Sequence, residues 1–387
     1  MEKTDTPMAT CTTREHHLPE AAIGTARKLL SVHFAPPKAT RKAYIQAGLH
    51  ADEAPGYLVA ARLVELLHRA HAAGEICEEI IVVPVANPIG LAQWGTDTVQ
   101  GRFDDSDHVN FNRRYYDLVD SIVERMQGLQ QEDGAANVRL IRKQLREILR
   151  EKKPTTEGES LKHLLLSLSC DADIVLDLHC DHQAVLHVYM GKALWPEGAD
   201  LSAQMGAMAT LLADDSGDMP FDEANSKIWW ELAKKFPEAA IPPACLAATI
   251  ELRGVADTDP EHTEQDARNL YFFLQRRGFI SGHTPPLPAL FAEATPLAGV
   301  DYLTSTGAGI LSYLKQPGDL VAAGEAVALV TQPMKNPGTG AKVAIASRTS
   351  GVFFARSADR FARPGKIIGK VAGSAVLEGK GPYLLTF

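Results

Sequence analysis

The chain has 387 residues, and its 45% hydrophobic and 22% charged residues are typical of a soluble globular protein. Its formal net charge is -9, so it lacks the surplus of Lys and Arg that a nucleic-acid-binding surface carries. No apolar run approaches the length of a membrane span, and the polar N-terminal residues lack the apolar core of a signal peptide. We therefore expect a cytoplasmic protein with neither a nucleic-acid nor a membrane partner.

The N-terminal part of the chain begins with a polar stretch, residues 1–24, which we expect to form a poorly ordered or loosely docked arm. The first predicted strand covers residues 43–47, and apolar residues at helical spacing over 59–70 predict the helix that follows. The uninterrupted apolar run at 80–85 is typical of a strand covered on both faces. The polar stretch over 93–109 indicates a long loop, and such loops often carry function.

The middle of the chain contains a strongly charged segment, residues 117–153, whose apolar spacing predicts a helical insertion at the surface. The other elements predicted here are a helix at 161–168, strands at 174–179, 185–190 and 247–252, and a helix at 264–277. Strands that alternate with helices in this way indicate an α/β domain, which we place at residues 25–282.

The composition changes at the Pro-rich segment 281–288, which we interpret as a linker. Beyond it, short apolar runs alternate with Gly-rich turns. This pattern predicts a small all-β domain over residues 290–387.

Residues suited to one metal ion follow two of the predicted strands. His50 and Glu53 lie in the loop after the first strand, and His179 ends a later one. Ligand sites in α/β sheets lie beyond the carboxyl ends of strands, so these side chains are able to converge. Two His and one Glu form a catalytic zinc set that keeps one position open for water. With 13 His in the chain, a His-x-x-Glu pair alone is weak evidence; its place between a strand and a helix strengthens it.

Asp177 is predicted to share a strand face with His179, where it would orient the imidazole ring. A carboxylate that is merely hydrogen-bonded at a sheet edge is an equally good interpretation of Asp177. Glu251 ends the strand at 247–252 and is the candidate general base, although a salt bridge to Arg253 would also explain it.

Three further polar residues are candidates for contacts with substrate. Asn112 and Arg113 offer a planar set of donors for a carboxylate, and Arg102 would stabilise an oxyanion. An asparagine turn and solvated arginines are the simpler explanations of these residues when each is considered alone.

Together, four sequence elements resemble those of the succinylglutamate desuccinylase/aspartoacylase family, which is related to zinc carboxypeptidases. The family's Gly-x-His-Gly-x-Glu motif is similar to residues 48–53, with Ala51 where Gly is usual. Its Asn-Arg element matches residues 112–113, its Asp-Leu-His element matches 177–179, and its Glu after a strand matches Glu251. The order and spacing of all four agree, and the resemblance covers roughly residues 40–380.

The resemblance implies a zinc-carboxypeptidase-like fold, with a mixed sheet flanked by helices and a small C-terminal all-β domain. It implies one zinc ion per chain, held by His50, Glu53 and His179. The implied reaction is hydrolysis of the amide bond of a small N-acyl amino acid.

The family's other roles map onto four residues of this chain. By resemblance, Glu251 would serve as general base and acid, Asn112 and Arg113 would hold a substrate carboxylate, and Arg102 would polarise the carbonyl. The match of Arg102 is the least specific of these, because loop lengths differ there.

Three alternative hypotheses remain open. The first is a metallocarboxypeptidase that acts on peptides. The second is a biotinyl or lipoyl carrier. Lys335 after Met334 weakly resembles the lysine to which such a carrier attaches its cofactor, although residues 336–340 extend that segment. The third is an inactive binding protein, which no motif position supports. The sequence leaves open the acyl group, the amine, the role of the segment 117–153, and whether the chain forms a homo-oligomer.

Overall fold

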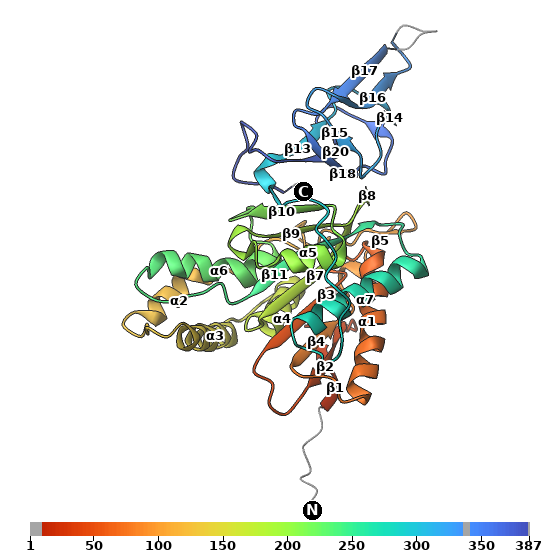
Figure 1. Ribbon diagram of the computed structural model, residues 1–387. Helices are drawn as coiled ribbons and strands as arrows, with labels where there is room; N and C mark the ends of the chain where they lie inside the picture. Colours follow the sequence, from red (N-terminus) through yellow and green to blue (C-terminus); the bar gives the residue numbers. More distant parts are fainter. Residues whose placement is uncertain (1–9, 336–340, 386–387) are drawn as a thin grey trace, which may run out of the picture.

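The structure of the protein is a computed structural model that describes residues 10–335 and 341–385. A large domain of sheet and helices carries a smaller β-rich domain at one end (Figure 1). This arrangement confirms the predicted mixed sheet flanked by helices with a C-terminal β-domain. None of the described helices is long and apolar enough to cross a membrane.

The large domain is built on a nine-stranded sheet in the order β1-β2-β4-β3-β7-β11-β9-β10-β12. Its strands are β1 (Thr10–His17), β2 (Lys28–Ala35), β3 (Lys42–Ala47), β4 (Glu79–Val83), β7 (Ile174–Asp181), β9 (His187–Gly191), β10 (Ala209–Ala213), β11 (Leu246–Gly254) and β12 (Thr295–Pro296). The central strands β4, β3, β7 and β11 run parallel to one another. They are nearly continuous apolar runs because both of their faces are covered.

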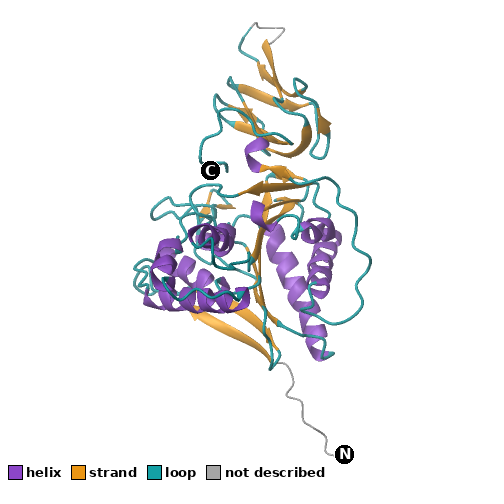
Figure 2. Ribbon diagram, turned by 60° about the vertical axis from the view of Figure 1, so that its left-hand side comes forward, coloured by secondary structure: helices purple, strands orange, loops and turns teal. Residues whose placement is uncertain are grey.

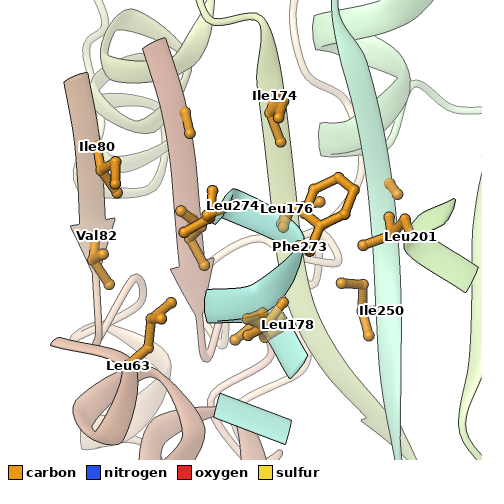
Figure 3. Packing of buried hydrophobic residues seen from close by; sticks show 14 of the residues in the cluster. Leu63, Ile80, Val82, Ile174, Leu176, Leu178, Leu201, Ile250, Phe273 and Leu274 are labelled. Atoms are coloured by element: carbon orange, nitrogen blue, oxygen red, sulfur yellow. The ribbon is translucent and has the colours of Figure 1, made fainter. Parts of the chain in front are cut away.

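Helices cover both faces of this sheet (Figure 2). One face carries α1 (Ala54–Ala72), α5 (Ala199–Met205) and α7 (Pro260–Arg276). The other face carries α2 (Val119–Met126), α3 (Gly134–Glu151), α4 (Glu157–Ser169) and α6 (Phe221–Lys235). In Figure 3, Leu63 of α1 and Phe273 of α7 pack over apolar side chains of the central strands, among them Leu176. Burial of this surface holds the strands, and therefore their carboxyl ends, in a fixed register.

The N-terminal segment differs from the prediction of an arm over 1–24. Residues 10–17 form the edge strand β1, which pairs antiparallel with β2 from Thr10 opposite Ala35 to His17 opposite Lys28. The strand is missed because its side chains are polar and almost all exposed, so it lacks the apolar alternation that identifies a half-buried strand.

The charged segment 117–153 is helical, as predicted, but it is not a surface insertion. Its helices α2 and α3 bury Ile122, Ile141 and Leu145 in the core on one face of the sheet. The many charged residues of these amphipathic helices lie mainly on their solvent-facing side, which explains the wrong placement.

The C-terminal domain consists of two small antiparallel sheets, in the orders β13-β20-β18-β15 and β17-β16-β14-β19. Its strands are β13 (Val300–Thr304), β14 (Gly309–Tyr313), β15 (Leu320–Val321), β16 (Ala326–Gln332), β17 (Ala341–Ala346), β18 (Gly351–Arg356), β19 (Phe361–Ala362) and β20 (Ile367–Gly373). The short strand β8 (Gln183–Ala184) of the large domain pairs with β18 and joins the two domains. Lys335 follows β16, and the residues 336–340 after it lie outside the described part of the chain.

The remaining elements are short. The hairpin of β5 (Trp94–Gly95) and β6 (Thr98–Val99) lies within the predicted loop 93–109, and 3-10 helices cover Gly90–Ala92, Lys192–Leu194 and Leu297–Gly299.

Candidate active site

Three neighbouring parallel strands, β3, β7 and β11, end at the same edge of the sheet. In the pair of β3 and β7, Ala47 lies opposite Leu178. In the pair of β7 and β11, His179 lies opposite Glu251. Directly opposed residues of paired strands project from the same face, so Glu251 and His179 are neighbours. The loop that leaves β3 brings His50 and Glu53 to the same place.

The conformation of that loop depends on Gly48. Its φ of 74° is in the left-handed region, and a Cβ there would lie 2.3 Å from the ring of Tyr57. The Tyr57 hydroxyl donates a hydrogen bond to the Ala51 carbonyl at 3.1 Å, which ties the loop to the first turn of α1. The glycine therefore allows the close turn that presents His50 and Glu53.

His50, Glu53 and His179 form a buried cluster, in which one ligand atom of each lies within 4.8 Å of the others. The Nδ1 atom of His50 lies 2.9 Å from Glu53 Oε1, and the Nδ1 atom of His179 lies 2.8 Å from Glu53 Oε2. The Cys180 backbone N–H also donates to Glu53 Oε2 at 2.9 Å. Glu53 is thus fixed between the two imidazoles, and Cys180 contributes its backbone rather than its thiol.

The second ring nitrogen of each imidazole, Nε2, contacts a side-chain oxygen. His50 Nε2 lies 2.8 Å from Asn110 Oδ1, and His179 Nε2 lies 2.9 Å from Asp177 Oδ2. The Asn112 backbone N–H donates to the same Asn110 atom at 2.8 Å, which identifies that atom as the amide oxygen. With a metal ion bound, a proton on Nε2 of each ring would satisfy these two oxygens and would leave both Nδ1 lone pairs free for the ion.

This donor set fits a zinc ion. Zinc binds imidazole nitrogen and carboxylate oxygen at about 2.0–2.2 Å, which brings neighbouring ligand atoms to within a few ångströms of one another. The Nδ1 atoms of His50 and His179 and the Glu53 carboxylate meet that requirement without rearrangement of their outer hydrogen bonds.

Electrostatics within the cluster keep Glu53 charged. Burial alone would raise the pKa of Glu53, but the adjacent His179 and His50 hold it well below its usual range. Burial, together with the positive charge of Arg102, lowers the pKa of His50 to about 4, so this imidazole is neutral at pH 7. Burial opposes charge on His179 as well, but Asp177 and Glu53 raise its pKa well above the usual value.

Glu251 faces the cavity next to this cluster. Its Oε2 is buried without a hydrogen-bond partner in the described part of the chain, and burial followed by the charge of Glu53 raises its pKa to about 8. The alternative salt bridge to Arg253 does not form. A register shift after Glu251 turns Arg253 away, and its guanidinium pairs with Asp266 of α7 instead.

The other predicted site residues lie around the same cavity. Arg102 donates to Glu53 Oε1 at 2.7 Å. Arg113 is 8% exposed and donates to the Asn112 carbonyl at 2.7 Å, and the Asn112 side-chain oxygen accepts from the Phe221 backbone N–H at 2.8 Å. All eight residues predicted from the sequence thus come together: three form the cluster, Asp177 lies behind His179, and the other four lie around the cluster.

The cavity has a volume of about 420 Å³ and is lined by both domains. Lys370 of β20 reaches across to Asp181 of β7, with 2.5 Å between Nζ and Oδ2. Tyr302 of β13 lines the wall beside it.

Sequence reasoning did not identify several of the surrounding residues. Asn110 carried a signal, because it precedes the Asn-Arg pair in the same segment. Lys370, Asp181, Asp222 and Glu223 carried none, because only the folded chain brings them to the cavity.

Comparisons with known proteins agree with the geometry. A model of the succinylglutamate desuccinylase/aspartoacylase catalytic domain matches residues 39–276, more than half of the chain. Among curated proteins, no sequence matches.

Several solved structures share the fold. One is a succinylglutamate desuccinylase/aspartoacylase family protein of Shewanella amazonensis, with 25% identity, a TM-score of 0.80, and coverage of 93% of this chain and 98% of that one. A related protein of Shewanella frigidimarina has 24% identity and a TM-score of 0.82, and covers 95% and 98% of the two chains. The ectoine utilization protein EutE (DoeB) of Ruegeria pomeroyi is 16% identical over 94% and 98% of the chains, with a TM-score of 0.64.

Proposed function

Because this chain belongs to the succinylglutamate desuccinylase/aspartoacylase family, a family of deacylase-type hydrolases, we propose that it is a zinc-dependent amidohydrolase that removes the acyl group from a small N-acyl amino acid. The observation that carries the proposal is the buried His50–Glu53–His179 cluster with Glu251 beside it in one cavity.

The proposed zinc ligands are His50, Glu53 and His179, one ion per chain. Zinc at this position would supply Lewis-acid activation of water and of the substrate carbonyl. Asp177 and Asn110 would orient the two imidazoles, since their oxygens contact Nε2 of His179 and His50 and leave Nδ1 on the side of Glu53.

The proposed general base and acid is Glu251. It lies directly opposite His179 on the neighbouring strand, and no hydrogen bond from the described residues holds its Oε2. A carboxylate with a pKa raised by burial is able to take a proton from the attacking water and return it to the amide nitrogen as the C–N bond breaks.

The cations of the cavity have two proposed tasks. Arg102, fixed by its hydrogen bond to Glu53, would stabilise the negative charge that develops on the carbonyl oxygen. Arg113, with Asn112, would hold a substrate carboxylate. One N–H of Arg113 is occupied by the Asn112 carbonyl, which positions the rest of the planar guanidinium for bidentate recognition.

The size of the cavity favours a small substrate over a peptide. At about 420 Å³, with walls contributed by the C-terminal domain, it matches the lower range of small-molecule sites. Turnover of N-acetyl amino acids should therefore exceed that of N-acetylated tetrapeptides; the reverse preference would favour the metallocarboxypeptidase.

The decisive variant is Glu251→Gln, assayed on a panel of N-acyl amino acids. Because general acid and base catalysis contributes about 10²- to 10⁴-fold, kcat should fall by at least 100-fold with the bound zinc unchanged. The exposed Glu261 of α7 provides a matched control, Glu261→Gln, which should keep full activity. Turnover that survives in Glu251→Gln would refute the assignment.

A further inference from the structure

Two acidic residues of the cavity wall take no part in the proposed chemistry. Asp222 and Glu223 begin helix α6, are 7% and 5% exposed, and line the same cavity as the metal cluster. They lie on the wall that also carries Asn112 and Arg113, because the Phe221 backbone N–H donates to the Asn112 side chain.

Two other acidic residues of the site have cationic partners. Glu53 pairs with Arg102, and Asp181 pairs with Lys370. Within residues 10–335 and 341–385, no Lys, Arg or His nitrogen lies within 4.0 Å of the carboxylate of Asp222 or Glu223.

The side chain of Glu223 is only half satisfied. Its Oε1 accepts from the Ser216 backbone N–H at 2.7 Å, but its Oε2 is buried and has no partner within the described residues. Leaving a buried carboxylate oxygen unpaired is costly, so a ligand that supplies a donor there would gain affinity.

The pKa shifts of Asp222 and Glu223 indicate the charge of that ligand. Burial, together with the charge of Glu223, raises the pKa of Asp222 to about 7, and burial also raises the pKa of Glu223. A cationic group between the two would remove this penalty, whereas an anionic group would increase it.

The neighbouring Arg113 defines the rest of the ligand. Asp222 and Arg113 are both buried in the same wall, without an ion pair between them. The wall therefore offers one positive and two negative groups to a single small molecule. An amino acid that carries a carboxylate and a free ammonium group satisfies both kinds of charge.

Resting on the proposed deacylase function, we propose that the substrate is an N-acylated diamino acid, whose free ammonium group binds Asp222 and Glu223 while Arg113 holds its carboxylate. The acyl group is carried either by the α-amine or by the side-chain amine. Both forms present one carboxylate, one ammonium group and one amide.

The test compares substrates of similar size that differ in charge. Nα-acetylornithine and Nδ-acetylornithine supply the ammonium group in the two positions, Nα-acetylglutamine has a neutral side chain, and Nα-acetylglutamate has an anionic one. One of the ornithine derivatives should exceed the glutamine derivative in kcat/KM by at least about 10-fold, because a desolvated ion pair contributes that much discrimination. A preference for the glutamate derivative, or no preference, would overturn the inference.

The variant Asp222→Asn should reduce that preference by about 10-fold, chiefly through a higher KM for the ornithine derivative. Glu223→Gln should act in the same direction, and it serves if Asp222→Asn fails to fold. The exposed Glu238 lies beyond the end of α6, and Glu238→Gln should leave the ratio unaltered. An unaltered ratio in both cavity variants would contradict the assignment.

Binding separates failure of this inference from failure of the proposed function. If no amide is cleaved, titration calorimetry of the zinc-loaded protein with the same four acetyl amino acids still tests the charge preference. One of the ornithine derivatives should bind most tightly, and Asp222→Asn should abolish its advantage. Equal binding of the four compounds would overturn the inference whatever the activity.

Discussion

A buried chain of polar side chains behind the metal cluster sets its geometry at the scale of single residues. The Tyr44 hydroxyl donates to Gln46 Oε1 at 2.9 Å, and Gln46 Nε2 donates to Asp177 Oδ1 at 3.0 Å. The other Asp177 oxygen accepts from His179. Every member is buried, so the chain leaves the His179 ring little freedom to turn.

Asp177→Asn should weaken zinc binding, because an amide supports the imidazole less strongly than a carboxylate does. Loss of such an outer partner typically lowers metal affinity by about 10- to 100-fold. Competition with a chromogenic chelator measures the change. The exposed Asp120 of α2 supplies the control Asp120→Asn, and equal affinities in the two variants would show that Asp177 does not support the site.

Much of this site could be predicted at the residue scale, because its motifs lie at the ends of strands that the sequence makes recognisable. His50, Glu53, His179 and Glu251 each follow or end an apolar run. What supports these residues could not be predicted. For example, the contact of Asn110 with His50 joins residues 60 positions apart through a loop of irregular conformation.

At the scale of elements, the turn between β3 and α1 is the part on which the site depends most. Gly48 has a positive φ and lies against Tyr57, whereas Gly74, after α1, has a similar φ of 72° with nothing within 4 Å of the position that a Cβ atom would take. The two glycines therefore separate backbone strain from steric contact.

Gly48→Ala should destabilise the protein more than Gly74→Ala. Both substitutions impose the strain of a left-handed alanine, roughly 1–2 kcal/mol, but only Gly48→Ala forces a methyl group into the Tyr57 ring. Overpacking of this kind costs about 1–3 kcal/mol, which the difference in unfolding free energy between the variants should show. Similar losses in the two proteins would mean that Tyr57 moves aside without cost.

Errors of prediction at this scale have a common physical origin. Strand β1 and helices α2 and α3 are polar on their exposed sides, and their places are decided by partners distant in sequence. Strand β1 pairs with β2 through backbone hydrogen bonds that need no apolar residue. The central strands, in contrast, are apolar on both faces and were recognisable directly.

At the scale of the whole molecule, the C-terminal domain closes one side of the cavity. The contacts between the domains include Lys370 with Asp181, β8 with β18, and the ring of His187 at 4.8 Å from that of Phe354. None of these pairs carries a signal in the sequence, so a linear motif search finds the metal cluster but not the cavity wall.

Stability at this interface should depend on pH through His187. Burial lowers its pKa from 6.5 to about 4, so the unfolded chain binds a proton between these values and the folded chain does not. The folded state therefore loses stability as the pH falls from 6.5 toward 4, by up to about 3 kcal/mol.

Urea unfolding of the wild type and of His187→Gln, from pH 7 to pH 4.5, measures this contribution. The difference in unfolding free energy between the two proteins should shrink as the pH falls. The variant His283→Gln, which removes an exposed histidine, should follow the wild type. A difference that stays constant with pH would exclude His187 as the titrating group.

Metal analysis combined with removal and return of zinc tests the central claim most directly. Purified protein should contain one zinc ion per chain, lose N-acyl amino acid hydrolysis after exhaustive chelation, and recover it when zinc is added. The variant His179→Ala should neither retain the ion nor recover. Full hydrolysis by the chelated wild-type protein, or unimpaired zinc binding by His179→Ala, would contradict the account.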